Sequence, residues 1–224
     1  ALVERALMGG DCLNVGCVPS KGLVRAAHAT ADARGAAAFG VGVDGVRPDF
    51  AAAMARVRAL RARLAPIDSA ERFRDLGVDV FQGSARFVTP DAIAVDGQRL
   101  EFQRAVIATG ARATGLPVPG LAEAGFLTNE TVFTLPVPPA RLVVIGAGPI
   151  GCEMAQAFAR LGVAVTMVSL DPRLLPREDA DAAAVLATRF AREGITTALG
   201  ARLVRVEQRG AARAVLFDRG RGVE

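Results

Sequence analysis

The chain has 224 residues, 51% of them hydrophobic, which is enough for one large core or two ordinary ones. Its net charge of +4 and pI near 9.7 could indicate nucleic-acid binding. The basic residues are scattered among acids, however, Trp and Tyr are lacking, and no lysine-rich block could follow a phosphate backbone. Composition therefore argues against a nucleic-acid partner.

No apolar run is long enough to cross a membrane, so we expect no membrane partner. The first residues carry no charged leader and no cleavage site. Three cysteines, two of them close together, fit a reducing compartment. We therefore expect a cytoplasmic protein. Lys21 is the only lysine, which suggests that its compact ammonium has a role that arginine would not fill.

The first four residues, Ala1 to Glu4, read as a short apolar strand that ends in an acid. In a dinucleotide-binding unit, an acid at the end of the second strand binds the ribose hydroxyls. The glycine-rich loop that should precede this strand is not in the sequence. The chain is thus expected to begin inside a Rossmann unit.

Two cysteines, Cys12 and Cys17, lie five residues apart in the segment Gly9–Lys21. An ideal helix would place them about 140° apart around its axis, so bringing the sulfurs together requires an irregular turn. Gly16 permits such a turn, and Pro19 suits an early helix position. Thiols at a helix N-terminus are favoured as thiolates, which indicates a redox pair.

A buried structural cysteine pair and half of a zinc site are the alternatives. A zinc site would need further cysteine or histidine ligands nearby, and only Cys152 and His28 remain, so we expect no metal. The run Cys12-Leu-Asn-Val-Gly-Cys-Val-Pro-Ser-Lys21 resembles the signature of the flavin-dependent pyridine nucleotide–disulfide oxidoreductases. This family includes dihydrolipoamide dehydrogenase, glutathione reductase and mercuric reductase.

The resemblance implies a role for each residue of this motif. Cys12 would be the exposed interchange thiol, Cys17 the thiol that faces the flavin, and Lys21 a cation beside the flavin ring. Glu4 would bind the ribose of FAD. Gly10, Asp11 and Cys12 would also contact this cofactor.

Asp11 departs from the family pattern, in which this position is often threonine. A short acid before a helix can cap free N–H groups. Its charge beside Cys12 should oppose formation of the thiolate. We therefore expect Asp11→Thr to increase the thiolate fraction of Cys12.

Two helices are predicted next, over 19–38 and 49–76, separated by a glycine-rich loop. Pro66 should kink or divide the second helix. His28, on the first helix, is expected to be a packed or surface residue rather than a catalyst. Asp96-Gly97 predicts a tight hairpin. Short strands are predicted over 78–81, 85–88, 92–95, 99–102 and 104–108.

The last of these strands runs into Ala108-Thr109-Gly110, which resembles the family's Ala-Thr-Gly segment. There, a strand delivers a tight glycine turn against FAD, so Thr109, Gly110 and Ala111 are expected FAD contacts. Gly83-Ser84-Ala85 likewise resembles a family segment beside the adenine of FAD, which makes Ala85 a further expected contact.

Two proline-rich stretches, 116–120 and 135–139, indicate a stiff crossing between domains. We place the boundary near residue 137. Residues 1–137 would be part of an FAD-binding domain and residues 138–224 part of an NAD(P)-binding domain. The expected fold is α/β, with two incomplete Rossmann-like domains of three-layer ββα form and no dimerisation domain.

The second expected domain opens with a buried strand, residues 141–145, followed by Gly146-Ala-Gly-Pro-Ile-Gly151 and a helix. A strand before G-x-G-x-x-G and a helix after it is the context in which this motif binds a dinucleotide. Gly146 would make the turn, Gly148 would admit the pyrophosphate, and Gly151 would let helix and strand approach. Pro149 and Ile150 complete the loop, and Glu153 matches the family's acid near the nicotinamide ribose.

The following strand, residues 163–168, ends at Ser169, where members specific for NAD usually carry an acid. The missing carboxylate and the nearby Arg173 favour NADPH over NADH. The alternative is that Arg173 merely belongs to its own loop. A helix over 179–192 with Gly194 as its stop, and strands near 198, 203–206 and 214–217, should complete this part.

The sequence thus indicates an oxidoreductase that passes electrons from NAD(P)H through FAD to the Cys12–Cys17 pair. The final acceptor would be a small molecule: a disulfide, a quinone-like compound or mercuric ion. The runs Asp68-Ser-Ala-Glu-Arg-Phe73 and Thr128-Asn-Glu-Thr131 resemble mercuric-reductase-like members more than lipoamide dehydrogenases, although the C-terminal cysteine pair that mercury chemistry normally needs is not in this sequence. The alternative is a nucleotide-binding fragment without turnover. Homodimerisation is expected only of the full-length protein.

Overall fold

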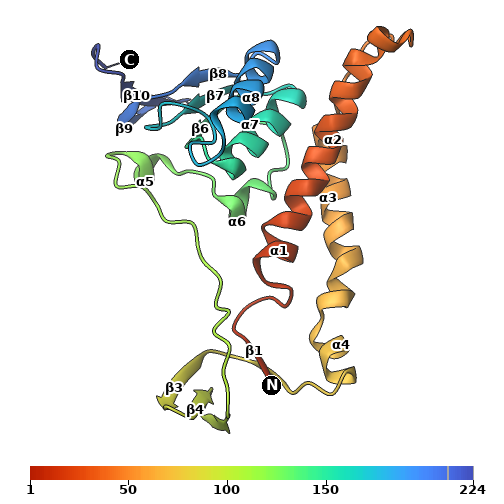
Figure 1. Cartoon of the computed structure of the whole chain (residues 1–224), viewed down its shortest axis with the longest axis vertical. Coiled ribbons are helices and arrows are strands. Elements are labelled where there is room, and N and C mark those ends of the chain that lie inside the picture. The colour runs from red at the N-terminus through yellow and green to blue at the C-terminus, as the bar shows by residue number, and fades with distance from the viewer. Residues whose placement is uncertain (211, 224) are drawn as a thin grey trace.

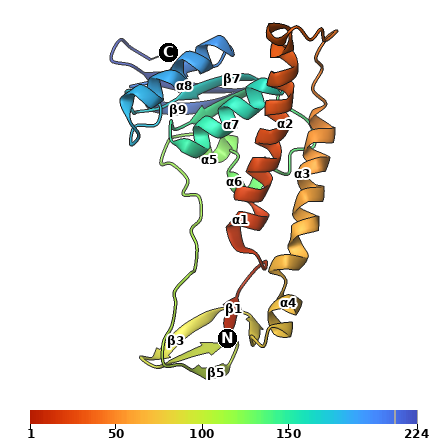
Figure 2. The same ribbon diagram turned by 45° about the vertical axis from the view of Figure 1, so that its right-hand side comes forward.

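The computed structural model describes residues 1–210 and 212–223. Figure 1 shows a long helical hairpin made by α2 (Cys17–Gly35) and α3 (Phe50–Leu64). A group of short strands lies at one end of the hairpin, and a compact α/β part lies beside the other end, as Figure 2 also shows. The hairpin therefore connects the two ends of the molecule.

The second predicted helix begins at a short polar residue and is interrupted at a proline. The Asp49 carboxylate accepts a hydrogen bond from the Ala52 N–H at 2.9 Å and caps α3. The prediction that Pro66 divides the second helix is confirmed, because α3 gives way to the 3₁₀ turn η2 (Ala65–Asp68) and then to α4 (Ala70–Asp75). The first predicted helix is α2, extended by the 3₁₀ turn η1 (Ala36–Phe39). The one-turn helix α1 (Gly10–Asn14), which precedes α2, was not predicted.

Two small sheets form the end of the molecule near the N-terminus. Strand β1 (Leu2–Glu4) pairs in parallel with β2 (Val80–Gln82). Strands β3 (Ala85–Thr89), β4 (Ala92–Val95) and β5 (Gln98–Glu101) form an antiparallel sheet in that order. The predicted hairpin at Asp96-Gly97 is confirmed, since both residues have positive φ, 46° and 88°, as a tight β4–β5 turn requires.

The predicted strand over 104–108 is wrong. This segment has no regular structure, and Val106 and Ile107 are 92% and 71% exposed. A strand needs a neighbour to accept its backbone hydrogen bonds and a surface on which to bury its side chains. Within the described residues no strand lies beside it, and Figure 1 shows it as part of an extended thread.

The compact part is built on a parallel sheet with the order β6 (Arg141–Ile145), β7 (Ala164–Val168) and β8 (Thr196–Ala198). Two helices follow the first two strands, α7 (Pro149–Arg160) and α8 (Ala180–Arg192), and Gly194 with φ 75° ends the second. An antiparallel pair of strands, β9 (Arg202–Arg209) and β10 (Ala212–Asp218), completes the compact part. The one-turn helices α5 (Leu121–Ala124) and α6 (Asn129–Val132) lie between the two proline-rich stretches and were not predicted.

These elements make three layers, with α7, the parallel sheet and the β9–β10 pair in turn. Val168 and Ala198 of the sheet are buried together with Ala201, and Leu203 and Phe217 of the β9–β10 pair pack against them. On the other face, α7 buries Phe158 against the sheet. The α/β, Rossmann-like fold predicted for this region is therefore confirmed.

The helical hairpin shares a core with α7. Leu23 and Met54 are fully buried in the same cluster as Phe158, and the rings of Phe50 and Phe158 lie 5.8 Å apart. Arg34 of α2 also donates to the carbonyl of Arg160 at 2.9 Å. The core thus continues across residue 137, where the domain boundary remains a prediction.

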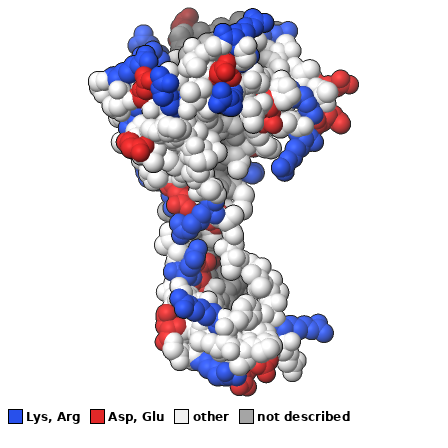
Figure 3. Space-filling model, turned by 90° about the vertical axis from the view of Figure 1, so that its left-hand side faces the viewer, with Lys and Arg blue, Asp and Glu red and all other residues white. Residues whose placement is uncertain are grey.

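The surface carries both signs of charge. On the face shown in Figure 3, basic and acidic side chains are interspersed, without a continuous basic stripe. Among the described residues, no helix is both long and apolar enough to cross a membrane.

Candidate active site

The two cysteines lie on different helices that meet at a sharp break. Cys12 lies within α1, Cys17 is the first residue of α2, and a disulfide bond joins them with their Cα atoms 4.6 Å apart. The break falls at Gly16, as predicted. A Cβ placed on Gly16 would lie 2.9 Å from the carbonyl oxygen of Asp11, so only glycine lets the chain turn back this closely.

Side chains that the sequence did not single out hold this turn together. The Asn14 amide donates to the carbonyls of Met8 and Gly10, at 3.0 Å and 2.9 Å, and so ties α1 to the segment before it. Asn129 of α6 donates to the Val15 carbonyl at 3.4 Å, between the two cysteines. Asn14 lies inside the motif, so the sequence alone could have suggested that its side chain bonds to the nearby backbone. Asn129 is 114 residues from its partner, and its contact has no local signal.

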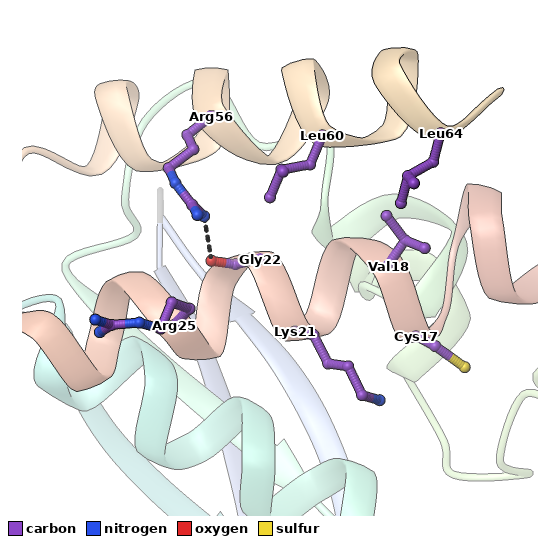
Figure 4. A pocket seen from close by; sticks show the side chains of 8 residues that line it. All are labelled: Cys17, Val18, Lys21, Gly22, Arg25, Arg56, Leu60 and Leu64. Atoms are coloured by element: carbon purple, nitrogen blue, oxygen red, sulfur yellow. Dashed lines mark hydrogen bonds between the residues drawn. The ribbon is translucent and has the colours of Figure 1, made fainter. Parts of the chain in front are cut away.

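Both cysteines are exposed, and Lys21 is exposed one turn after Cys17. Residues four apart on a helix lie on one face, and Figure 4 shows Lys21 and Cys17 leaving α2 on the same side. The structure therefore brings the disulfide and the single lysine of the chain together. His28, further along α2, is exposed.

An open groove of about 290 Å³ adjoins this site, between α2 and α3. We call it the α2–α3 groove. The residues that line it are Cys17, Val18, Lys21, Gly22, Arg25, Arg56, Leu60 and Leu64. Figure 4 shows Val18, Leu60 and Leu64 directed into the space between the two helices, and Arg56 reaching from α3 towards the carbonyl of Gly22 at 3.5 Å.

Asp11 does not cap a helix, contrary to expectation. Among the described residues no N–H donates to its side chain, because the carboxylate turns towards Gly110 instead. A Cβ on Gly110, where φ is 67°, would lie 3.3 Å from Asp11 Oδ2. The structure thus brings the segment Thr109–Ala111, whose three residues are exposed, against the cysteine motif about 100 positions earlier in the chain.

The other expected FAD contacts form a second group near the N-terminus. Glu4 ends β1, and its carboxylate accepts the Ala6 N–H at 2.8 Å. The Gly83 N–H donates to the Glu4 carbonyl at 2.9 Å, which holds the Gly83–Ala85 segment beside this acid. An acid at the end of a parallel strand fits the ribose of a dinucleotide, whereas the space at Gly83 is filled, since a Cβ placed there would collide with the Asp96 carboxylate.

The glycine-rich loop after β6 has an open backbone. Gly146 has φ 103°, and its N–H donates to the Val168 carbonyl at 2.8 Å, so the loop begins as a turn anchored to β7. Nothing lies within 4 Å of a Cβ placed on Gly148, which precedes α7. A Cβ on Gly151 would collide with the Gly146 carbonyl. These features fit a pyrophosphate above the first turn of α7.

The remaining residues of this loop lie at its surface or beneath it. Pro149 is the first residue of α7, Ile150 is 70% exposed, and Glu153 is exposed on α7 beside His28 in a small cavity. Cys152 is buried, and its Sγ donates to the Ala147 carbonyl at 3.5 Å. Burial raises the pKa of this thiol, so Cys152 packs rather than reacts.

Ser169 and Arg173 are both held by their own segment. Ser169 is only 4% exposed, and its hydroxyl donates to Asp171 Oδ2 at 3.0 Å. Arg173 donates to the carbonyls of Leu175, Pro176 and Glu178 at 3.0, 2.8 and 2.7 Å. Its guanidinium therefore stabilises the loop after β7, which is the alternative role considered for it from the sequence.

No group of three or more His, Cys, Asp or Glu side chains is arranged to hold a metal ion within the described ranges. The disulfide, the single lysine and the glycine-rich loop are the chemical features of the site. All three lie on or beside α2 and α7, the two helices that share the main core.

This chain resembles known proteins over nearly all of its length. The family model described as pyridine nucleotide-disulphide oxidoreductase matches residues 1–224. A mercuric reductase of Bacillus cereus is 34% identical over 94% of this chain and 33% of its own length. A dihydrolipoyl dehydrogenase of Pseudomonas aeruginosa is 36% identical over 93% of this chain and 46% of its own length.

Among solved structures, the HOCl-induced flavoprotein disulfide reductase RclA of Escherichia coli, in its Cu(II) complex, matches with a TM-score of 0.79 and 27% identity. The match covers 100% of this chain and 48% of that one. The chain thus spans from a third to about half of the length of these relatives. Since the family model matches from the first residue to the last, the chain belongs to the pyridine nucleotide-disulphide oxidoreductase family.

Proposed function

We propose that this chain belongs to an FAD-dependent oxidoreductase that takes electrons from NAD(P)H and delivers them through the Cys12–Cys17 disulfide to a small-molecule acceptor. One observation carries the proposal. The disulfide at the start of α2 and the glycine-rich loop at the start of α7 are joined through a shared buried core. FAD, when bound, accepts a hydride equivalent from the nicotinamide and supplies two electrons to the disulfide.

The residues of this chain would hold and orient the reactants. Glu4 and the Gly83–Ala85 segment would hold the adenosine half of FAD, and the Gly110 turn, Asp11 and Lys21 the flavin half. Lys21 is a cation on the same face of α2 as Cys17, so it would stabilise negative charge as the flavin ring is reduced. Gly146, Gly148 and Gly151 would admit the pyrophosphate of NAD(P)H.

The acceptor step belongs to the cysteines. The reduced pair carries two thiols, both exposed. The Cys12 thiolate would attack one sulfur of an acceptor disulfide and release the other half as a thiol. Cys17 would then attack Cys12, release the second thiol and restore the Cys12–Cys17 bond, so that two electrons and two protons pass to the acceptor. Quinone-like compounds and mercuric ion are the other acceptors that the family resemblance leaves open.

NADPH remains the proposed donor because no carboxylate occupies the end of β7, where Ser169 stands. Two contacts reduce the expected preference for NADPH over NADH. Arg173 would have to leave three carbonyls to reach a 2′-phosphate, and the Asp171 carboxylate lies 3.0 Å from the Ser169 hydroxyl. We therefore expect kcat/KM for NADPH to exceed that for NADH by less than about tenfold. Arg173→Gln should leave this ratio unchanged.

A second candidate is a nucleotide-binding protein without turnover. It is favoured by the glycine-rich loop before α7, which would bind a nucleotide whether or not the disulfide turns over. The absorbance of the purified protein separates the two. A yellow protein whose flavin bands bleach when NADPH is added without oxygen supports the oxidoreductase, whereas a colourless protein that still binds NADPH supports the second candidate.

We further propose that the oxidoreductase lies in the cytoplasm and that the full-length protein forms a homodimer.

A further inference from the structure

The one-turn helix α6 is fixed at both of its ends. A capping box holds its start, where the Thr128 hydroxyl accepts the Glu130 N–H at 3.2 Å and the Thr131 hydroxyl accepts the Thr128 N–H at 2.9 Å. At its other end, Val132 and Phe133 are 8% and 4% exposed and belong to the main core. The side chain of the first residue of the helix takes no part in these contacts and is free to reach a neighbouring segment.

That first residue is Asn129, and its amide reaches the turn between the two cysteines. Figure 2 shows α6 close to α1, and Asn129 Nδ2 donates to the Val15 carbonyl at 3.4 Å in a partly buried contact. Val15 follows the last residue of α1, and its own N–H donates to the Asp11 carbonyl at 2.8 Å. The contact thus joins α6 to the residue at which α1 ends.

The Val15 carbonyl needs a donor from outside its own segment. In a continuous helix the N–H four residues later would supply it, but that residue is Pro19, which has no N–H. The Gly16 carbonyl, one position later, does receive such a bond, from the Ser20 N–H at 3.0 Å. In the described part of the chain, Asn129 is the only donor to the Val15 carbonyl. An unpaired, partly buried carbonyl costs free energy, so the contact stabilises this turn.

The stabilisation differs between the two redox states. When the disulfide is closed, the Cα atoms of Cys12 and Cys17 are held 4.6 Å apart, so the Val15 carbonyl is already in place for Asn129. When the disulfide is open, α1 has more freedom relative to α2, and forming the same contact then costs conformational entropy. The contact is therefore stronger in the oxidised protein, and by linkage it favours the closed disulfide over the dithiol.

We propose that Asn129 is a positioning residue of the redox pair, which holds the turn between the two cysteines and so favours the disulfide over the dithiol. A pair that prefers the disulfide is a stronger reductant of its acceptor. This inference rests on the proposed function, because it takes the Cys12–Cys17 pair as the group that reacts. It also gives the run Thr128–Thr131 a role at the redox pair.

The test measures the equilibrium between the protein disulfide and dithiothreitol. The reagent gives two electrons and two protons to the disulfide, so that its own two thiols close into a cyclic disulfide while Cys12 and Cys17 become thiols. The purified protein is equilibrated without oxygen in mixtures of reduced and oxidised dithiothreitol. The fraction of molecules with free thiols is then trapped by alkylation and measured by mass spectrometry.

Two variants of Asn129 and one control give the expected pattern. Asn129→Ala removes the donor. Asn129→Asp keeps the shape, replaces the donor by a carboxylate and suits the first turn of a helix, so α6 should still form. In both we expect the equilibrium constant for reduction by dithiothreitol to rise about two- to fivefold, as the loss of part of one hydrogen bond predicts. The control Glu130→Gln alters the ion pair of the neighbouring residue with Arg112, at 3.3 Å, and leaves Asn129 in place, so the constant should not change.

Urea unfolding of the same variants shows whether the contact has only a structural role. If both Asn129 variants lower the unfolding free energy equally in the oxidised and the reduced protein, and the equilibrium constant keeps its wild-type value, the contact merely stabilises the fold and the inference is overturned. A rise of the same size in Glu130→Gln would assign the effect to α6 as a whole and would also overturn it.

The equilibrium needs neither NADPH nor turnover, which separates the inference from the function on which it rests. If NADPH does not reduce the disulfide but the constant rises in both Asn129 variants, the oxidoreductase fails and the positioning role of Asn129 stands. If NADPH reduces the disulfide and the constant is the same in every variant, the oxidoreductase stands and the inference is overturned.

Discussion

Replacing Gly16 by alanine tests whether the break between α1 and α2 is what holds the cysteines together. The new Cβ would lie 2.9 Å from the Asp11 carbonyl oxygen and 3.3 Å from both the Asp11 carbonyl carbon and the Cys12 Cα. All three are backbone atoms, so no side chain can move aside. Forcing a methyl group into such a site costs about 1–3 kcal/mol of unfolding free energy.

The cost should depend on the redox state. In the oxidised protein the Cys12–Cys17 bond prevents α1 from moving away from α2, so the full penalty applies. After reduction α1 can shift and relieve part of the contact. Urea unfolding of Gly16→Ala, measured with and without a reductant, should therefore show the larger loss in the oxidised protein.

Gly35→Ala is the matched control. Gly35 ends α2 with φ −88°, and nothing lies within 4 Å of a Cβ placed there. This substitution should leave the unfolding free energy unchanged or raise it by up to about 1 kcal/mol, since alanine has less conformational freedom when unfolded. If Gly16→Ala changed stability by less than 0.5 kcal/mol, or no more than the control in either redox state, the account of this turn would be refuted.

Three further predictions concern the nucleotide-binding part and the third cysteine. Gly151→Ala should lower the unfolding free energy, measured with urea, by about 1–3 kcal/mol because its Cβ meets the Gly146 carbonyl. Gly148→Ala should leave the unfolding free energy unchanged and weaken the binding of NADPH, measured by calorimetry. A stable Gly151→Ala together with a destabilised Gly148→Ala would contradict this. Reduced native protein should show two rapidly reacting thiols with a disulfide reagent, and Cys152, which is 5% exposed, should react only on unfolding; three fast thiols would contradict its burial. Burial raises the pKa of Glu193, but hydrogen bonds from Arg160 and Arg189 outweigh this and hold the pKa below its ordinary value of 4.5. Because the pKa of Glu193 is lower in the folded than in the unfolded chain, this group stabilises the fold at pH values above the unfolded pKa. The unfolding free energy should therefore fall as the pH drops from about 4.5 through the lowered pKa, and Glu193→Gln should remove that part of the pH dependence. If the pH dependence of stability is the same in Glu193→Gln, the contacts of Glu193 with Arg160 and Arg189 contribute nothing to it.

The features that could be predicted from sequence are those with local physical causes. Pro66 divides the second helix because it cannot continue a helical hydrogen-bond ladder. Asp96-Gly97 turns because both residues adopt positive φ. The strand, glycine-rich loop and helix of residues 141–160 are likewise set by neighbours in the chain.

The features that could not be predicted depend on distant parts of the chain. Residues 104–108 are apolar enough for a strand, but a strand also needs a partner beside it. Asp11 was expected to cap a helix, and it instead faces Gly110. Arg173 was the expected contact for a 2′-phosphate, and three carbonyls of its own loop hold it. Polar side chains have several possible partners, and only the folded chain decides among them.

The α2–α3 groove is another such feature. The sequence shows arginines spaced along the second predicted helix, and a solvated face was their simplest interpretation. Arg58 and Arg63 are exposed and lie outside the groove, as that interpretation requires, but Arg56 lines it together with Arg25 of the other helix. Which arginines flank the redox pair depends on how the two helices pack, and the close approach at Gly22 determines that packing: a Cβ there would lie 3.2 Å from Val57 Cγ2.

The central claim is that electrons from NAD(P)H reach the disulfide at the start of α2. Counting thiols tests it most directly. Flavin-loaded protein is incubated with NADPH without oxygen, freed of nucleotide and titrated under denaturing conditions. The account predicts two more thiols than in the untreated protein, and no gain in Cys12→Ser. Bleaching of the flavin without any gain in thiols would contradict it.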